Sequence, residues 1–406
     1  INESERMVRR LVIEHLTMNP EQELPTSLTL VSIVHDIERL GDYAKSIAEL
    51  REMSDVTLAN GGLGRRCREV QAEIEPMFAL AIEGITDDNE ALQGHLAKYA
   101  DHEKAGLTAL NTAFLNDGVF IHVPEGKMVE HPIHILYVSA DRETPTVTHP
   151  RTLVVAESCA SVTVVESYIG LSQHRYFTNA VTELVTGQSA VIDHYRINRE
   201  SLDAFHTSMT QTEQHDDSNI STFNMCMGGA LTRNDTQAHL NGEHIVTRMN
   251  GLYLITGTQH VDNHTAMDHA KPNCNSYEVY KGILDGHSHA VFNGKVFVRK
   301  DAQETDAKQL NKNLLLSPTA SVDTKPQLEI FADQVKCTHG ATVGQLDEDQ
   351  VFYSITRGMS REVACNLLTY GFAADLVRRL KVKAIREQLD ELFEETIKGL
   401  AETRSH

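Results

Sequence analysis

The chain has 406 residues, with 37 Lys and Arg against 57 Asp and Glu, a formal charge of −20 at pH 7. Its length predicts two or three domains, and the acidic balance without a basic stripe argues against nucleic acid or an anionic membrane as partner. No apolar run of about 18 residues predicts a transmembrane helix. The six cysteines are widely spaced without a C-x-x-C pair. Together with the lack of a secretory signal, this argues against a disulfide framework and favours a cytoplasmic location.

Residues 1–18 and 27–50 predict two helices with a proline-containing break between them. In the second helix the apolar residues recur at spacings of three and four, which is typical of the seam of a helical bundle. Glu38, Asp42 and Glu49 form a carboxylate stripe beside this seam. By spacing alone, such a stripe indicates a solvated helix face.

The stretch HDIERLGDYAKSIAEL, residues 35–50, resembles the signature helix of PhoU-like phosphate-response proteins. The resemblance implies that Glu38 and Asp42, which match an E-x-x-x-D pattern, bind a metal ion. It predicts a partial PhoU-like bundle over residues 1–90. Residues 54–64 are then the link to a second repeat, which begins at 65–84 and is incomplete.

Residues 91–118 predict a helical lead-in, and residues 119–355 predict a β region. Short β-branched segments separated by Gly, Asp, Asn, Ser and Pro turns are typical of strands. Clear examples are Val119–Val123, Ile133–Val138, Thr152–Ala156, Val162–Tyr168, Val181–Val185 and Ala190–Tyr195. A long run of such strands is compatible with a sandwich, a propeller or a β-solenoid. A solenoid of stacked coils fits best, and a large sandwich remains the alternative.

Residues 356–406 return to a helical pattern, with Ser360 as the expected N-cap. The apolar positions of two helices are Val363, Leu367, Phe372, Leu376 and Leu380, then Ile385, Leu389, Leu392 and Phe393. Two helices with one apolar face each cannot bury both faces alone. We therefore expect this pair to pack on the β region or on a partner.

The segment KCTHGATVGQLDED, residues 336–349, carries the first candidate site. Cys337 and His339 are two residues apart in a predicted strand, so their side chains share one face. A thiolate beside an imidazole suits iron or an iron–sulfur cluster, and the alternative is a buried thiol next to a surface histidine. Thr338 is expected to point the opposite way, into the solenoid or toward the next coil.

The segment HVDNHTAMDH, residues 260–269, carries the second candidate site. Its histidines and aspartates are as dense as the ligands of a metal site. On strands and turns, however, we expect His260 and His264 not to share a face. The alternative is a ladder of polar side chains that satisfy backbone groups at turns.

Several longer stretches resemble the SufB/SufD family of iron–sulfur cluster assembly proteins. They are NGLYLITGTQHVDNHTAMDHAKP (250–272), YKGILDG (280–286), FNGKVFVRKDAQETDAKQLNKNLLLS (292–317) and TKPQLEIFAD (324–333). Residues 336–349, 109–126 and 357–380 resemble the SufD branch of the family. The resemblance covers residues 90–400.

This resemblance implies a right-handed parallel β-helix flanked by helices, and a scaffold subunit rather than an enzyme. The implied partners are a SufB-like subunit near residues 325–350 and a SufC-like ATPase on residues 360–380, where Leu367 and Phe372 are the expected contacts. The chain has no G-x-x-x-x-G-K-[ST] motif, so ATP would be bound by that partner. The N-terminal helical region usual in the SufD branch is expected to be missing, replaced by the PhoU-like segment.

The resemblance also implies that Cys337 and His339 hold a transient iron–sulfur cluster at the SufB interface. Cys337 would supply a thiolate, helped by a nearby metal or cation, and His339 would act as a neutral imidazole ligand or proton acceptor. Two other functions stay open. One is a PhoU-like, metal-binding regulator of phosphate uptake, and the other is a β-helix carbohydrate-active enzyme with paired carboxylates.

Overall fold

The structure is a computed structural model that describes residues 90–115, 118–140 and 145–404. The PhoU-like segment, with Glu38 and Asp42, lies outside the described residues. The helices are α4 (Glu90–His95), α5 (Gly106–Ala113), α6 (Glu348–Thr356), α7 (Arg361–Val377) and α8 (Lys383–Arg404).

The described residues between α5 and α6 form seventeen strands. They are β1 (Gly118–Val123), β2 (Ile133–Ser139), β3 (Val147–Thr148), β4 (Arg151–Ala156), β5 (Ser161–Gly170), β6 (Phe177–Thr186), β7 (Val191–Arg199), β8 (Phe205–Gln214), β9 (Asn219–Cys226), β10 (Leu231–Leu240), β11 (Val246–Ile255), β12 (His260–His269), β13 (Asn275–Leu284), β14 (His289–Val298), β15 (Thr305–Leu315), β16 (Ser321–Ile330) and β17 (Val335–Gly344). All six strands named from the sequence are present.

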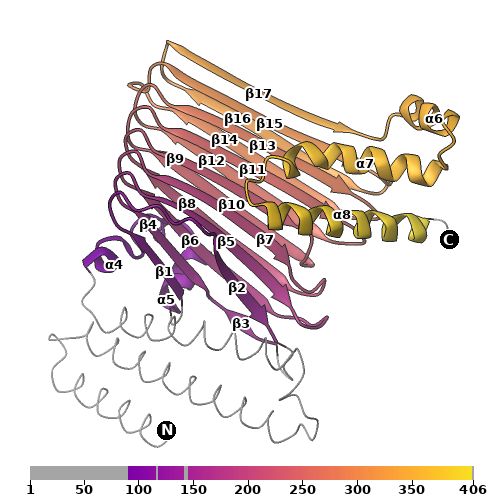
Figure 1. The fold of residues 1–406 in the computed structure, drawn as a ribbon, viewed down its shortest axis with the longest axis horizontal. Coiled ribbons are helices and arrows are strands. Elements are labelled where there is room, and N and C mark those ends of the chain that lie inside the picture. Colours follow the sequence, from indigo (N-terminus) through magenta and orange to yellow (C-terminus); the bar gives the residue numbers. More distant parts are fainter. Residues whose placement is uncertain (1–89, 116–117, 141–144, 405–406) are drawn as a thin grey trace, which may run out of the picture. The chain divides into compact units, whose positions relative to one another are not determined.

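The strands form two parallel sheets, which are visible as stacked rows in Figure 1. Sheet A has the order β1-β4-β6-β8-β10-β12-β14-β16, with β3 beside β6, and sheet B has the order β17-β15-β13-β11-β9-β7-β5-β2. Each coil contributes one strand to each sheet and pairs only with the coils before and after it. The chain therefore folds as a parallel β-solenoid of about eight coils, which confirms the predicted fold class and excludes the sandwich.

The alternation of inward and outward side chains explains why these segments form strands. In β10 every second residue is buried, from Thr232 to Leu240. The inward residues of successive coils stack in columns: Thr232, Val261 and Ala290 are aligned in register at a spacing of 29 residues. A strand buried on one face and open on the other gives this period of two.

One corner of the coil uses a left-handed backbone in six successive turns. The residues are Cys159, Ser189, Asp217, His244, Asn273 and Glu304, with φ between 57° and 63°. Each lies just before a strand of sheet B, and none is glycine. Because the left-handed conformation is usually taken by Gly, Asn or Asp, these mixed residue types hide the repeat from a search by residue type.

Two glycines inside the solenoid make room for aromatic rings of the next coil. Gly251 pairs with Tyr280 and Gly282 pairs with Tyr253 in sheet B. A Cβ atom at Gly251 would lie 2.2 Å from the Tyr280 ring, and one at Gly282 would lie 2.2 Å from the Tyr253 ring. Both tyrosines are buried, so each glycine is required by the close approach of a ring from the neighbouring strand.

Helices cover part of the outer face of each sheet. On sheet A, α5 is held by Asn111, whose amide donates to the carbonyls of Pro150 (3.0 Å) and Asn179 (2.9 Å). Next to it, the buried ion pair of Arg151 and Glu183 has an N–O distance of 2.8 Å. Glu183 also accepts hydrogen bonds from the backbone N–H groups of Tyr99 and Ala100, both at 2.9 Å. These contacts fasten the lead-in segment to the solenoid.

On sheet B, α7 and α8 cover the outer face, as Figure 1 shows. The apolar residues of the two helices pack against outward side chains of β5, β7, β9, β11 and β13. The prediction that the helical pair packs on the β region is therefore confirmed, as is Ser360 as the N-cap of α7, which accepts from the N–H of Val363. In the described part of the chain, no helix combines the length and the apolar character needed to cross a bilayer.

The position of α6 differs from the expectation that strands continue to residue 355. Strand β17 ends at Gly344, and α6 begins at Glu348. The reason is a local cap: the Asp347 carboxylate accepts from the N–H of Asp349, at 2.9 Å. The acidic residues Glu348 and Asp349 in the first turn further stabilise a helix start.

Candidate functional site

The last coil of the solenoid consists of β16 and β17, which end the strand order of their sheets. Each has one edge without a strand neighbour among the described residues. Side chains that face the solenoid interior in earlier coils are partly exposed here, because no further coil covers them. Val322, Leu328, Val335 and Cys337 are such residues, packed on the core but only partly buried. An uncovered edge with free backbone groups is a surface that another strand can pair with.

Cys337 and His339 lie on the inward side of β17, as alternate residues of one strand. Cys337 is aligned with the buried Ala307 of β15, and His339 with the buried Gln309. Cys337 is half-buried against the core, whereas His339 is exposed. The prediction that Thr338 points into the solenoid or toward the next coil is wrong: Thr338 is exposed, and it is Cys337 that faces the core.

The electrostatic surroundings of Cys337 differ from the expectation of a nearby cation. Burial raises the pKa of the thiol, the negative charge of Asp306 raises it further, and a hydrogen bond with the backbone of Ala307 opposes the shift. The group is therefore a protonated thiol at neutral pH. A metal ion that binds it has to displace the proton, which couples binding to pH.

Cys337 and His339 do not form a complete metal site by themselves. In the described ranges, no group of three or more His, Cys, Asp or Glu side chains is arranged to hold a metal ion. The nearby carboxylates serve other contacts, since Asp347 caps α6 and Glu348 forms an ion pair with Arg361 at 2.6 Å. The pair can supply at most two ligands, and the remainder would have to come from outside this chain.

The two proposed partner contacts on α7 have different surroundings. Leu367 is 50% exposed and Val363 is 53% exposed, so this face of the helix is free of the solenoid. Phe372 instead packs against the sheet B core. Its ring lies 4.8 Å from Lys281 Nζ, and the same ammonium donates to the Phe372 carbonyl at 2.7 Å. Leu367 is therefore available to a partner, and Phe372 helps to dock the helix.

Strand β12 carries the second candidate segment, and its histidines do not lie as expected. His260, Asp262 and His264 alternate on the outward face of the strand, because residues four apart on a strand share a face. His264 pairs with Asp262 at 2.9 Å. His269 faces the interior next to Ser276, and burial lowers its pKa to about 4.

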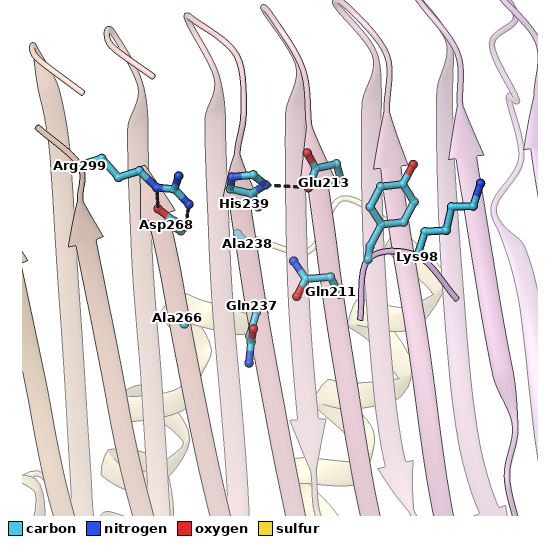
Figure 2. A pocket seen from close by; sticks show the side chains of 10 residues that line it. Lys98, Gln211, Glu213, Gln237, Ala238, His239, Ala266, Asp268 and Arg299 are labelled. Atoms are coloured by element: carbon cyan, nitrogen blue, oxygen red, sulfur yellow. Dashed lines mark hydrogen bonds and ion pairs between the residues drawn. The ribbon is translucent and has the colours of Figure 1, made fainter. Parts of the chain in front are cut away.

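A groove of about 360 Å³ crosses the outer face of sheet A over β8, β10 and β12 (Figure 2). Apart from Lys98, the charged side chains of its lining are paired within the protein. His239 contacts Glu213 at 2.8 Å, and Arg299 contacts Asp268 at 2.6 Å. The groove is therefore polar but largely neutralised.

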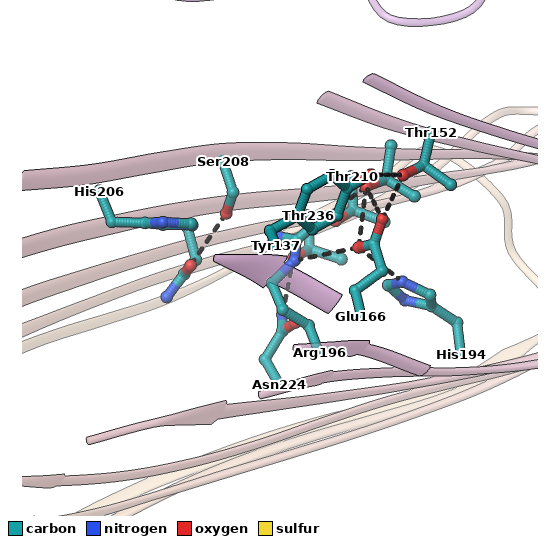
Figure 3. Close-up of polar contacts among 12 residues, drawn as sticks. Tyr137, Thr152, Glu166, His194, Arg196, His206, Ser208, Thr210, Asn224 and Thr236 are labelled. Atoms are coloured by element: carbon teal, nitrogen blue, oxygen red, sulfur yellow. Dashed lines mark hydrogen bonds and ion pairs between the residues drawn. The ribbon is translucent and has the colours of Figure 1, made fainter. Parts of the chain in front are cut away.

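Sequence analysis missed a polar cluster inside the solenoid, shown in Figure 3. The Glu166 carboxylate has no exposed surface and accepts hydrogen bonds from His194 Nε2 (3.0 Å) and from the hydroxyls of Thr152 (2.5 Å) and Thr182 (3.1 Å). Arg196 lies 3.5 Å away. Burial raises the pKa of Glu166, but His194 and Arg196 together outweigh burial and lower the pKa to about 2. The only sequence signal was charged residues at inward positions of predicted strands.

Another buried carboxyl lies four coils further along, at Glu278. Burial raises the pKa of Glu278 to about 7, although hydrogen bonds from Thr265 and from Gln309 Nε2 (2.9 Å) lower it. Glu278, Gln309 and His339 occupy the same register position in three successive strands of sheet B. The interior polar column therefore reaches the open end of the solenoid.

These features define a class: a parallel β-solenoid with a polar interior, an uncovered last coil bearing a cysteine and a histidine, and helices on the outer face of each sheet. Residues 137–372 match the SufBD core domain of the SUF system for iron–sulfur cluster assembly, and residues 56–135 match the N-terminal region of SufBD proteins. Residues 1–50 match the PhoU domain. The chain belongs to the SufBD family of iron–sulfur cluster assembly proteins.

Individual relatives agree with this assignment. The chain is 35% identical over 308 residues to a SufBD family protein of Synechocystis, covering 74% of this chain and 68% of the relative. It is 34% identical over 272 residues to SufD of Escherichia coli (66% and 64%) and 29% identical over 294 residues to SufD of Bacillus subtilis (72% and 67%). The aligned part thus spans about two thirds of these relatives' lengths.

The matches correct the expected organisation of the N-terminal half. The family's N-terminal region is not missing, because it matches residues 56–135. This match includes most of the segments 54–64 and 65–84, which were expected to be a link and a second PhoU repeat. The PhoU match itself ends at residue 50.

Proposed function

We propose that this chain is a scaffold subunit of an iron–sulfur cluster assembly complex. It pairs with a SufB-like subunit through the last coil, β16 and β17, and binds a SufC-like ATPase through the exposed face of α7. The chain itself carries out no catalysis, and ATP hydrolysis takes place in the partner. The nascent cluster is the cargo, and it forms where Cys337 and His339 meet the SufB-like subunit.

One observation carries this proposal: the solenoid ends on an uncovered coil whose inward residues include both Cys337 and His339. In earlier coils the same positions are buried by the next coil. A partner that continues the sheet would bury the pair in the same way. It would also complete a ligand set that the described part of this chain does not complete by itself.

Substitution of the two residues tests the cluster site. In a complex purified without oxygen together with SufB-like and SufC-like subunits, Cys337→Ala and His339→Ala should each lower the iron and sulfide content severalfold. His339→Ala should change stability by no more than about 0.5 kcal/mol, since the side chain is exposed, and Cys337→Ala by about 1 kcal/mol, since the thiol is half-buried. Iron content and thermal unfolding are measured on the same preparations.

Thr338→Ala is the matched control, because Thr338 lies between the two residues and faces the opposite way. It should leave the iron content unchanged. Full iron loading in both Cys337→Ala and His339→Ala would overturn the proposed site, whatever the unfolding curves are.

The match of residues 1–50 to the PhoU domain supports a second candidate function, a metal-binding regulator of phosphate uptake through Glu38 and Asp42. Deleting residues 1–50 should then abolish the response of phosphate uptake to external phosphate and leave iron incorporation unchanged. Uptake of labelled phosphate and iron content of the complex separate the two functions. An unchanged uptake response would contradict the regulatory role. The carbohydrate-active alternative is set aside, because the chain belongs to a cluster-assembly family.

A further inference from the structure

Two histidines from successive coils face each other on the outer side of sheet A. His260 begins β12 and His289 begins β14, and the two are direct partners in the parallel ladder. Their Nδ1 atoms are 3.0 Å apart, and their ring centroids are 4.9 Å apart with the planes inclined by 31°. Neither residue belongs to the last coil or to the helical cover.

A third residue, Asp323, determines which ring nitrogen of His289 carries the proton. The Nε2 atom of His289 lies 3.1 Å from Asp323 Oδ2, on β16. Because a carboxylate only accepts, Nε2 must donate, and a neutral ring then carries a lone pair on Nδ1. This lone pair points toward His260. A carboxylate that orients a histidine through its second nitrogen is a recurring partner of metal-binding histidines.

The distance between the two Nδ1 atoms suits a shared metal ion. Imidazole nitrogens bind zinc at about 2.0–2.1 Å, so two nitrogens in neighbouring coordination positions lie about 3 Å apart. The same distance also allows one N–H···N hydrogen bond between the rings. The two arrangements differ in whether the pair captures an ion, which an experiment can decide.

The surroundings leave room for an ion and its water ligands. The side chain of His289 is 35% exposed and that of Asp323 is 81% exposed, so the site opens to solvent. Asp262, two residues after His260 on the same face, adds negative charge beside the pair. Its own contacts are with Arg233 (2.6 Å) and His264 (2.9 Å). Both histidines are fixed to paired strands, so little backbone freedom is lost on binding.

We propose that His260 and His289 form a two-imidazole binding site for a divalent transition-metal ion, with Asp323 as the positioning residue and water in the remaining positions. Imidazole ligands favour Cu²⁺, Zn²⁺ and Ni²⁺, with Cu²⁺ bound most tightly. The site lies on the outer face of the solenoid and is separate from Cys337 and His339.

Copper binding to the untagged full-length protein tests the site. With less than one equivalent of Cu²⁺, electron paramagnetic resonance should detect coupling to two imidazole nitrogens. His260→Gln and His289→Gln should each remove this two-nitrogen signal and weaken Cu²⁺ binding in calorimetry by at least tenfold. The double variant should bind Cu²⁺ at least as weakly as either single variant, because it lacks both imidazoles. Asp323→Asn should retain both nitrogens and weaken binding by about tenfold.

His264→Gln is the matched control, since His264 lies on the same face of β12 but pairs with Asp262 instead. It should keep the two-nitrogen signal and the affinity. The inference is overturned if His260→Gln and His289→Gln bind Cu²⁺ as tightly as the unaltered protein. It is equally overturned if the unaltered protein binds only at millimolar Cu²⁺, which would leave the histidines as a hydrogen-bonded pair.

Discussion

Replacing Glu166 by glutamine should lower the free energy of unfolding by about 3–5 kcal/mol at pH 7, because removing one partner of a buried ion pair leaves the other charge uncompensated. Arg196 and His194 both face the Glu166 carboxylate, and all three side chains are almost completely buried. Urea unfolding followed by circular dichroism measures the effect, since the chain contains no Trp.

The Glu166 carboxylate should also make the free energy of unfolding depend on pH in the acidic range. Its pKa is about 2 in the folded chain against an ordinary value of 4.5. The stability that Glu166 contributes is therefore fully present above pH 4.5 and is lost as the pH falls toward 2. In Glu166→Gln this part of the acid dependence should be missing.

Glu278→Gln is the matched comparison for Glu166→Gln. It should change the free energy of unfolding in the opposite direction. The folded pKa of Glu278 is about 7, so stability falls as the pH rises from 4.5 through 7, while the unfolded carboxyl ionises and the buried one does not. The difference between 4.5 and 7 corresponds to about 3 kcal/mol above pH 7. Removing the charge should therefore stabilise the chain by about 3 kcal/mol at pH 8 and leave it nearly unchanged at pH 4.

The neighbouring Gln309 can accommodate this change. Its Nε2 donates to Glu278, while its Oε1 has no hydrogen-bond partner among the described residues. Turning the amide over would let Oε1 accept from the new glutamine. Glu157→Gln, at a partly exposed carboxylate paired with His122, should change stability by no more than about 1 kcal/mol. If Glu166→Gln and Glu278→Gln shift stability in the same direction at pH 8, the account of the interior charges is wrong.

Leu367→Asp should weaken binding of the SufC-like ATPase by about 100-fold or more. A charge placed on a surface that becomes buried in the complex costs several kcal/mol, and about 1.4 kcal/mol corresponds to a tenfold change. Pairing with the SufB-like subunit should be unchanged, because the last coil is not altered. Co-elution from a size-exclusion column and titration of the ATPase measure both properties.

Two variants of the same helix serve as comparisons. Asn366→Asp adds the same charge one residue away without a change of shape, and it should retain ATPase binding. Phe372→Asp should lower the stability of the chain, since Phe372 packs on the solenoid beside Lys281. Normal co-elution of the ATPase with the folded Leu367→Asp variant would contradict this docking surface.

The period-two pattern and the turn residues of residues 119–355 predicted a β region and favoured a solenoid over a sandwich, since burial on one face is encoded locally along each strand. The same rule correctly placed Cys337 and His339 on one side of a strand. The helical pair and the cap at Ser360 are also local features, because they depend on residues within one turn of a helix. The resemblance to the SufBD family came from such contiguous stretches.

The direction in which each face points depended on tertiary structure. Cys337 faces the core because β17 stacks on Ala307 of β15, and no pattern within residues 335–344 specifies that choice. The cluster of Glu166 with Arg196 and the pairing of His260 with His289 join residues about 30 positions apart. These residues meet because of the length of each coil. The left-handed corner residues that fix this length are of mixed types, so no repeated residue marks the coil in the sequence. Sequence alone determined the alternation along each strand, and the stacking of the coils decided which side chains meet.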